Sequence, residues 1–357
     1  MEQNQYSPKL VDLLLLAAKQ GASDLHLSIG KKPIIRIDGK LISITKEDII
    51  TPEAMAGFVA AILTDEQEDY LLKNKEIDFA FSLEDKIRFR SNIYFQRGYL
   101  AAAFRLIPMH IRTIEELNLP PILHNFTNYN QGFILVVGPA GHGKTTTLAA
   151  MIDEINHKRM DHIITIEDPV EYLFIPDRAL ISQREVGGDT LNFSNGLRAS
   201  LRQDPDVLMI GEMRDAESMA IALTAAETGH LVFSTLHTNS AAQTLDRIID
   251  SFPSAQQSQI RAQLSAVLLG IISERLVPRI SGGRIPACEV LLMNTASRNL
   301  VRENKTYQID LVIETGVKEG MTSLNRSLAD LVRKREIAME TAELYSPNPE
   351  ELRSLLI

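Results

Sequence analysis

The chain has 357 residues, 45% of them hydrophobic, which is enough for two or three domains with buried cores. Its 46 acidic and 37 basic residues give a net charge of −9, which argues against a protein that binds the backbone of a nucleic acid. A single cysteine, Cys288, excludes internal disulfides and zinc sites built from several cysteines, and it favours the cytoplasm.

The first residues predict an amphipathic helix over 8–20. The apolar run at 10–18 contains Asp12 and lacks both a basic leader and a small-residue cleavage site, so we do not expect a signal peptide. No apolar run reaches the about 18 residues that a membrane-spanning helix needs. We therefore expect no direct insertion into a membrane, and attachment to one would go through a partner protein.

Residues 1–108 predict one α+β domain. Alternation of apolar and polar residues predicts strands at 24–28, 33–38, 40–44, 77–83, 87–94 and 99–106. Gly39 lies in the turn between the second and third of these strands, and a helix is expected over 52–74. Prolines bracket a weakly periodic segment, which we interpret as a linker over 109–120.

Residues 121–357 predict a second domain of α/β class. Continuous apolar runs that alternate with helices are typical of a parallel sheet buried on both faces, and they occur at 133–137, 163–166, 207–210 and 231–233. Each run ends in polar residues, at the carboxyl ends where such sheets bind ligands. Farther along, residues 254–276 predict one long amphipathic helix, and 281–284 predict a hairpin turn.

Residues 138–145 fit G-x-x-x-x-G-K-[ST], the pattern of a phosphate-binding loop between a strand and a helix. Free N–H groups and the helix dipole attract anions there, and the glycines let the backbone approach the phosphates. Lys144 can reach the β- and γ-phosphates, and the Thr145 hydroxyl can ligate Mg²⁺. We expect ATP to contact Gly138, Pro139, Ala140, Gly141, His142, Gly143, Lys144, Thr145 and Thr146.

Acidic residues follow two of the predicted strands. Phosphoryl transfer to water needs a group that orients the water and a metal ion near the phosphates. An acid after a strand is often only a solvated turn residue, but the phosphate loop favours a functional role here. We predict Glu212 as the water-orienting base and Glu167 as the second candidate, either as base or as holder of a Mg²⁺-bound water. Asp168 joins Glu167 and Thr145 in the predicted Mg²⁺ site.

Two histidines, His230 and His237, flank the run at 231–236. A lone histidine is more often a packed or exposed polar residue than a catalytic one, but two at the ends of such a strand make both interpretations equally tenable. His237 could sense the γ-phosphate, and His230 could lie near the same site from the other edge of the sheet.

Five sequence boxes in order resemble the secretion-ATPase superfamily, and within it the ATPases that retract type IV pili in twitching motility. They are the phosphate loop and residues 20–28, 165–172, 201–215 and 226–238. Residues 296–303 resemble the family's retraction motif AIRNLIRE, with departures at Ser297 and Val301. His142 stands where the family usually has serine, and its ring could touch phosphate or face solvent.

The resemblance implies a homohexamer whose subunits contain a PAS-like N-terminal domain and a RecA-like P-loop NTPase domain, with ATP between them. ATP would close the two domains, and hydrolysis would reopen them. Arginines of the N-terminal domain would reach the phosphates, where their charge suits the transition state. The matching positions are Arg90 and Arg105, with Arg97 as a third candidate, whereas the residues alone would indicate a strand face of solvated arginines.

The resemblance also implies a partner, the inner-membrane platform protein of the pilus machine, and hence a cytoplasmic location at the inner membrane. An accessory retraction ATPase of the PilU type is the nearest alternative, and a paralogue of that type is a further candidate partner. Assembly ATPases of pili or type II secretion usually have long N-terminal extensions and often a four-cysteine zinc module. The acidic balance and the 6% of aromatic residues disfavour a RecA-type nucleic-acid motor. The acidic clusters disfavour a scaffold that binds ATP without hydrolysing it.

Overall fold

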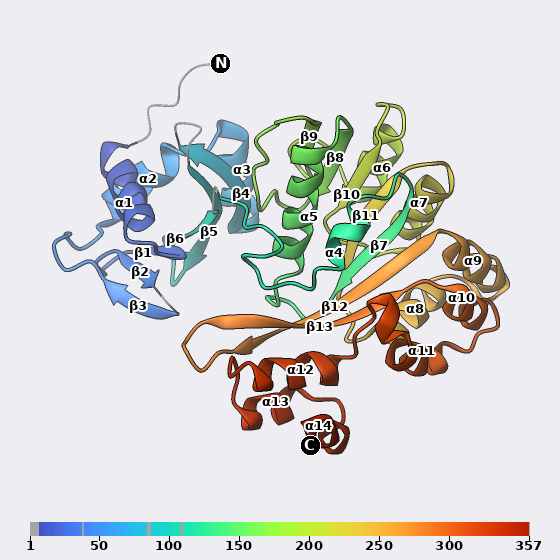
Figure 1. The fold of residues 1–357 in the computed structure, drawn as a ribbon. Coiled ribbons are helices and arrows are strands. Elements are labelled where there is room, and N and C mark those ends of the chain that lie inside the picture. The colour runs from blue at the N-terminus through green and yellow to red at the C-terminus, as the bar shows by residue number, and fades with distance from the viewer. Residues whose placement is uncertain (1–6, 38, 84–86, 108–109, 357) are drawn as a thin grey trace. The chain divides into compact units, whose positions relative to one another are not determined.

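The computed structural model describes residues 7–37, 39–83, 87–107 and 110–356. The chain divides into two compact units, one of Met1–His110 with Glu171–Leu173 and one of Ile111–Val170 with Phe174–Ile357 (Figure 1). The predicted domain boundary at residues 108 and 109 and the predicted end of a strand at residue 38 lie outside the described residues. No helix within those described ranges has the length and apolar character needed to cross a membrane.

The first unit is an antiparallel sheet packed against helices, as the sequence predicts. The strand order is β3-β2-β1-β6-β5-β4. The strands are β1 (Asp24–Ser28), β2 (Ile34–Ile37), β3 (Lys40–Ser43), β4 (Glu76–Leu83), β5 (Ile87–Gln96) and β6 (Tyr99–Ile107). Helix α1 (Pro8–Lys19) buries Leu10, Leu13 and Leu14 in the core of this unit.

The single helix expected over 52–74 is wrong, because the chain forms α2 (Pro52–Ala60) and then α3 (Asp65–Asn74). Thr64 starts the second helix with a capping box. Its hydroxyl accepts from the backbone N–H of Gln67 at 3.3 Å, and the Gln67 side chain accepts from the backbone N–H of Thr64 at 3.0 Å. This reciprocal pair satisfies two N–H groups that a new helix leaves unpaired, which makes the break favourable.

The second unit is built on a sheet in the order β13-β12-β7-β11-β10-β8-β9. Its strands are β7 (Gly132–Val137), β8 (His162–Glu167), β9 (Leu180–Glu185), β10 (Val207–Ile210), β11 (Leu231–Leu236), β12 (Leu268–Pro278) and β13 (Arg284–Leu292). Neighbouring strands from β12 to β9 are parallel, whereas β13 is antiparallel to β12. The mixed α/β class predicted from the sequence is therefore confirmed.

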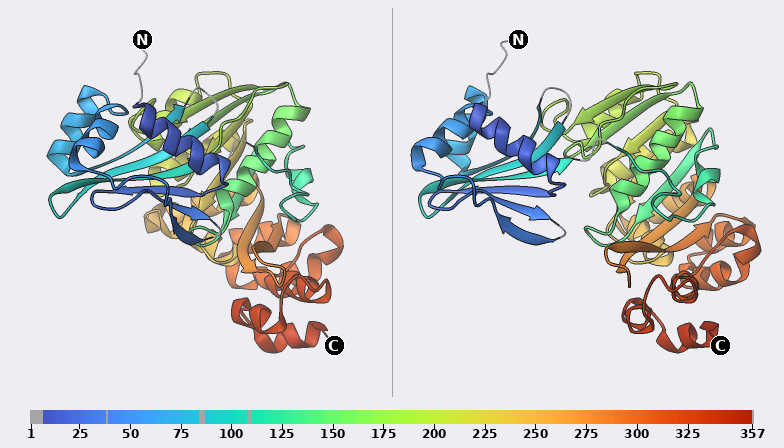
Figure 2. Two further views of the ribbon diagram at one scale, coloured as in Figure 1. Left: turned by 90° about the vertical axis from the view of Figure 1, so that its left-hand side faces the viewer. Right: turned by 60° about the vertical axis from the view of Figure 1, so that its left-hand side comes forward.

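Helices cover both faces of this sheet (Figure 2). The helices of this unit are α4 (Leu123–Phe126), α5 (Lys144–Lys158), α6 (Phe193–Ser200), α7 (Ala216–Glu227), α8 (Ala241–Asp250), α9 (Ser254–Val267), α10 (Thr295–Arg302), α11 (Ile309–Thr315), α12 (Leu324–Arg333), α13 (Met339–Tyr345) and α14 (Pro349–Leu356). Alternate residues of β7, such as Leu135, pack in one core with Leu223 of α7 and Leu245 of α8. Helix α5 packs against β7 and β11 from the opposite face.

The long helix expected over 254–276 is also wrong, because α9 ends at Val267 and the chain continues as β12. Gly270 marks the change. A Cβ atom at this position would lie 2.5 Å from Cζ of Phe126 and 2.7 Å from the carbonyl oxygen of Leu291 on β13. Gly270 and the two β-branched residues that follow it, Ile271 and Ile272, favour a strand with close neighbours over a helix.

The predicted hairpin turn at 281–284 is confirmed, since β12 and β13 pair from Gly270 with Leu292 to Pro278 with Arg284. The strand β9 was not predicted. Only its first two residues, Leu180 and Ile181, are apolar, and none of the six is buried, so β9 lacks the continuous apolar run that identified the central strands.

Candidate nucleotide-binding site

The carboxyl ends of four parallel strands bring the predicted polar clusters to one edge of the sheet. In the order β7, β11, β10 and β8, these strands are immediate neighbours. The phosphate loop follows β7, His237 follows β11, Glu212 comes shortly after β10, and Glu167 ends β8. The sequence correctly placed these groups together, because parallel strands end at the same edge.

The phosphate loop needs its glycines for both conformation and space. Gly138, Gly141 and Gly143 have φ angles of 151°, 74° and 97°, which side chains rarely allow. A Cβ atom at Gly138 would lie 2.5 Å from the carbonyl oxygen of Glu274, and one at Gly143 would lie 2.7 Å from Oε1 of Glu274. The loop is thus seated tightly on β12, and α5 begins directly after it at Lys144. Thr145 and Thr146 lie in the first turn of that helix, where N–H groups are available to an anion.

Lys144 connects the phosphate loop to His237 and, through it, to Glu212. The Lys144 side chain is buried, with 7% of the residue exposed, and its Nζ donates to the carbonyl oxygen of Pro139 at 3.0 Å. The same Nζ lies 3.3 Å from Nδ1 of His237, and Nε2 of His237 lies 3.2 Å from Oε2 of Glu212. Because an ammonium can only donate, Nδ1 of His237 accepts and its Nε2 proton faces Glu212. Glu212 also pairs with Arg214.

Glu167, the last residue of β8, and Asp168, which follows it, provide carboxylate oxygens beside β10. Glu167 is 3% exposed, and its Oε1 accepts from the Thr165 hydroxyl at 2.6 Å and from Nε2 of Gln183 at 3.1 Å. Within the described ranges, no group of three or more His, Cys, Asp or Glu residues could hold a metal ion. Mg²⁺ at a phosphate site, however, takes most of its ligands from phosphates and waters. The hydroxyl of Thr145, together with Glu167 and Asp168 at the end of β8, fits that limited set of ligands.

His230 lies at the other end of its strand. The backbone N–H of Gly132, the first residue of β7, donates to the carbonyl oxygen of His230 at 3.0 Å, whereas the phosphate loop follows the last residue of β7. Nδ1 of His230 lies 2.8 Å from the carbonyl oxygen of Ala225. The structure therefore does not bring His230 to the phosphate loop of its own chain, because one strand length separates the two ends of β11.

His142 turns onto β12. Its Nδ1 accepts a hydrogen bond from the backbone N–H of Leu276 at 3.0 Å. This nitrogen therefore neither faces solvent nor contacts a phosphate. Burial, followed by the positive charges of Arg275, Arg284 and Lys144, lowers the pKa of His142. The neutral ring is the form that can accept at Nδ1. His142 thus secures the loop from the side of the sheet.

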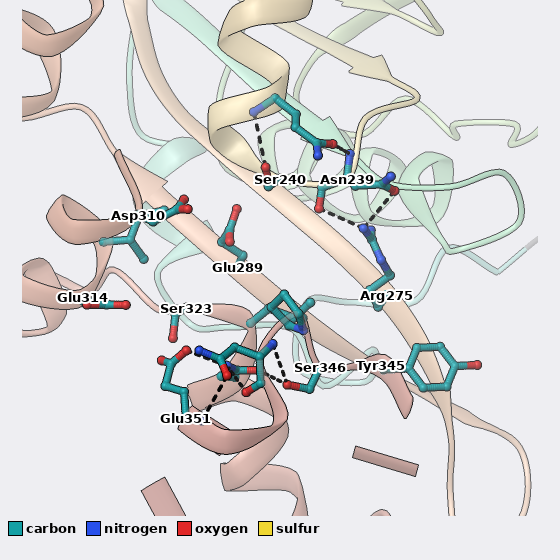
Figure 3. A pocket seen from close by; sticks show the side chains of 16 residues that line it. Asn239, Ser240, Arg275, Glu289, Asp310, Glu314, Ser323, Tyr345, Ser346 and Glu351 are labelled. Atoms are coloured by element: carbon teal, nitrogen blue, oxygen red, sulfur yellow. Dashed lines mark hydrogen bonds between the residues drawn. The ribbon is translucent and has the colours of Figure 1, made fainter. Parts of the chain in front are cut away.

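Sequence reasoning missed Glu274 and Arg275 on β12, because the segment was interpreted as a helix. Glu274 is 2% exposed, and its Oε2 accepts from the Thr147 hydroxyl at 2.7 Å. Arg275 donates from Nη2 to the backbone oxygen of Asn239 at 2.8 Å and to Oδ1 of Asn239 at 3.0 Å (Figure 3). A charged pair within a largely apolar segment was the available signal. The Arg275 contacts tie the segment after β11 to β12, and the Glu274 contact ties α5 to the same strand.

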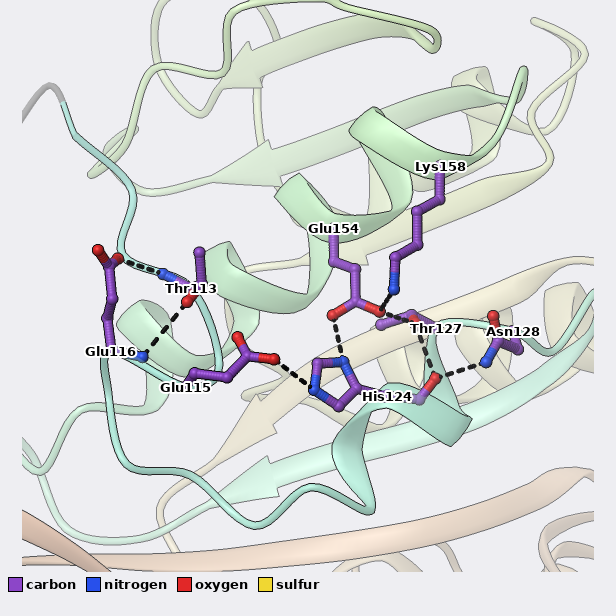
Figure 4. Close-up of polar contacts among 8 residues, drawn as sticks. All are labelled: Thr113, Glu115, Glu116, His124, Thr127, Asn128, Glu154 and Lys158. Carbon is purple, nitrogen blue, oxygen red and sulfur yellow. Dashed lines mark hydrogen bonds and ion pairs between the residues drawn. The ribbon is translucent and has the colours of Figure 1, made fainter.

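A histidine clamp holds the start of the second unit on α5 (Figure 4). Nδ1 of His124 lies 2.6 Å from Oε2 of Glu154, and Nε2 lies 2.9 Å from Oε1 of Glu115. The Thr127 hydroxyl and Lys158 Nζ donate to the other oxygen of Glu154 at 2.9 and 2.6 Å. The clamp therefore fixes the segment before β7 on the helix that begins with Lys144.

The predicted arginines lie on the sheet of the first unit. Arg90 on β5 is the direct cross-strand partner of Arg105 on β6, and Arg105 is in turn the partner of Asp24 on β1. Direct partners project from the same face. Arg105 Nε donates to Oδ1 of Asp24 at 2.9 Å. Arg97 lies in the turn between these strands with φ 52°. Arg90 and Arg105 thus form one row with an acid beside it.

Comparisons with known proteins agree with this geometry. A model of the type II/IV secretion system protein family matches residues 2–353. The type IV pilus retraction ATPase PilT of Pseudomonas aeruginosa is 44% identical over 341 residues, covering 96% of this chain and 99% of that protein. The type IV pilus ATPase PilU of the same organism is 37% identical over 345 residues, covering 96% and 90%. A crystal structure of the pilus retraction motor PilT with bound ADP has a TM-score of 0.91 at 44% identity, covering 97% and 99%.

Proposed function

Because the chain belongs to the type II/IV secretion system protein family, we propose that it is an ATP-hydrolysing motor that powers the retraction of type IV pili in twitching motility. The observation that carries the proposal is the contact of Lys144, His237 and Glu212 at the phosphate loop. Only the side chain of His237 separates the ammonium of Lys144, which can bind phosphate, from Glu212, an acid that can orient water. The resemblance to a retraction ATPase supplies the use to which the hydrolysis is put.

In this proposal the N–H groups of residues 138–146 and Lys144 bind the phosphates of ATP. Glu212 orients a water for attack on the γ-phosphorus and accepts its proton, while the bond to the β-phosphate oxygen breaks and leaves ADP and phosphate. His237, held between Lys144 and Glu212, senses whether the γ-phosphate is present. Thr145, Glu167 and Asp168 would hold Mg²⁺, which neutralises phosphate charge when bound.

We further propose that six subunits form a ring. Arg90 and Arg105 of the PAS-like N-terminal domain reach the phosphates, so that ATP draws this domain toward the RecA-like domain and hydrolysis releases it. Such a cycle does work only because ATP, ADP and the empty site favour different arrangements of the domains. The row formed by Arg90 and Arg105 on one sheet face supports this role, since both side chains would approach the same anion together.

The proposed setting is the cytoplasmic face of the inner membrane, where the ring would act on the platform protein of the pilus machine. An accessory role beside a second retraction ATPase is the alternative, because the chain also resembles PilU along most of its length. The higher identity to PilT, 44% against 37%, favours the main retraction motor.

Deletion of the gene, complemented with the wild type or with Lys144→Ala, tests the function. We expect the deletion and the variant to leave many pili that do not retract, and the wild type to restore retraction and twitching. Cells without pili would instead indicate an assembly role. Purified wild-type protein should release phosphate from ATP in magnesium buffer, and Lys144→Ala should not, because it lacks the cation that binds the β- and γ-phosphates.

A further inference from the structure

We propose that Glu274 is a positioning residue of the phosphate loop, and that ATP binding selects the state in which its carboxyl group carries a proton. The inference rests on the proposed function, since it assumes that ATP occupies this loop. It adds a proton-linked control of nucleotide affinity by a residue of β12 that does not itself contact the reacting atoms.

Glu274 supports the loop, and the helix that follows it, at three places. Its Oε2 accepts from the Thr147 hydroxyl at 2.7 Å, which fixes the first turns of α5. Its Oε1 fills the space where a Cβ of Gly143 would lie, and its carbonyl oxygen does the same at Gly138. Gly138 and Gly143 are the first and last glycines of the loop. One residue of β12 therefore limits how closely the loop approaches the sheet at both ends.

The surroundings make the charge of Glu274 dependent on what Lys144 contacts. Burial raises the pKa of Glu274 to about 7, while the Thr147 hydrogen bond and the charge of Lys144 act in the opposite direction. Other titratable or charged groups lie around Glu274. Cys288 is its partner on β13, Arg275 follows it in the chain, and His142 lies on the loop. A cavity of about 120 Å³ beside Glu274 is also lined by Arg112, Glu116, Arg279 and Arg284. Lys144 is the cation on the loop itself.

Phosphates would change this balance in one direction. They would engage Lys144 and bring negative charge to the loop, so an ionised Glu274 would lose its cation and gain a repulsive neighbour. Uptake of one proton from solvent onto the carboxylate removes both penalties. The Thr147 hydroxyl can donate to the carboxyl in either state, so the positioning contact survives protonation. By linkage, ATP must then bind more weakly as the pH rises through about 7.

The test uses the full-length protein and a non-hydrolysable ATP analogue with Mg²⁺. Affinity is measured by fluorescence titration between pH 6 and 8, and proton uptake by calorimetry at pH 7 in two buffers of different ionisation enthalpy. For the wild type we expect the dissociation constant to rise with pH, by at most about tenfold per pH unit, the limit for one proton. Glu274→Gln is a neutral isostere that retains an acceptor for Thr147. This variant should bind the analogue like the wild type at pH 6. Its dissociation constant should lose the part of the pH dependence that is due to Glu274, and binding should take up fewer protons than in the wild type.

Glu289→Gln is the matched control. Glu289 on β13 also has its pKa raised to about 7, chiefly by burial, but it faces Asn239, Asp310 and Glu314 in a separate cavity of about 600 Å³ (Figure 3). Glu289→Gln should keep the wild-type dependence of the dissociation constant on pH. A Glu274→Gln variant with the wild-type slope and proton uptake would overturn the proposal, and so would a wild type that takes up no more proton than the analogue's own phosphates require. Failure of the wild type to bind or hydrolyse ATP would contradict the proposed function itself.

Discussion

Nε2 of His237 lies 3.2 Å from Oε2 of Glu212, and both residues follow central strands of the sheet beside the phosphate loop. The contact aims an imidazole N–H at the acid that we propose as the base. The other carboxylate oxygen of Glu212, Oε1, pairs with Arg214. Glu212 is thus held by two side chains before any substrate arrives.

Glu212→Gln should lower the turnover number for ATP by about 10²–10⁴, the usual contribution of a general base, with ATP affinity changed only a few-fold. Glutamine can still accept from His237 but cannot take a proton from water. Phosphate release and nucleotide titration check the two quantities. Glu217→Gln, on an exposed acid of α7 that pairs with Arg198, is the control and should match the wild type. Hydrolysis at the wild-type rate by Glu212→Gln would remove Glu212 from the mechanism.

Arg105→Ala should lower hydrolysis in the assembled ring by about tenfold or more, since it removes a cation from developing phosphate charge. Arg36→Ala serves as the control. Nε of Arg36 also lies 3.6 Å from Oδ2 of Asp24, but Arg36 is not a proposed contact of ATP. Hydrolysis is measured on the hexamer fraction from gel filtration, so that lost assembly is not mistaken for lost catalysis. Normal turnover by Arg105→Ala in that fraction would show that Arg105 only pairs with Asp24.

His142 should make the second unit less stable in acid. Its pKa in the folded state is lowered, so the contribution is fully present above the unfolded value of about 6.5 and is lost as the pH falls toward the folded value. Denaturant unfolding at pH 7.5 and 5.5 should show a smaller pH effect for His142→Asn, which can still accept from Leu276. His157, whose pKa is raised by its hydrogen bond to Asp177, contributes with the opposite sign. Its replacement by Gln should steepen the loss in acid, and an unchanged pH effect in His142→Asn would contradict the assignment.

Gly270→Ala should destabilise the second unit by about 1–3 kcal/mol, as overpacking of a core typically does. The new methyl group would meet both the Phe126 ring and the carbonyl oxygen of Leu291 at under 3 Å, and the carbonyl cannot rotate away. Gly188→Ala, in the same unit, is the control, because its Cβ would meet no heavy atom nearer than 4.0 Å. Equal midpoints for the two variants in thermal unfolding would show that β12 can shift to make room.

The sequence by itself determined the elements whose signals are local. The loop of residues 138–145 needs only glycines, a lysine and a hydroxyl at fixed spacing. The runs that became β7, β8, β10 and β11 are almost entirely apolar and buried. Parallel pairing then carries Glu167, Glu212 and His237 to one edge without further information. The hairpin turn at 281–284 was readable for the same reason, since two adjacent glycines favour a turn wherever they lie.

Tertiary structure decided what depends on partners distant in the chain. Residues 268–276 have apolar spacing compatible with a helix, and pairing with β7 and β13 makes them a strand. That one change places Glu274 against Gly143, Leu276 against His142 and Arg275 against Asn239, more than thirty residues away in each case. Local propensity cannot anticipate these contacts, because the free energy that favours them comes from burial and pairing that exist only once the sheet has formed.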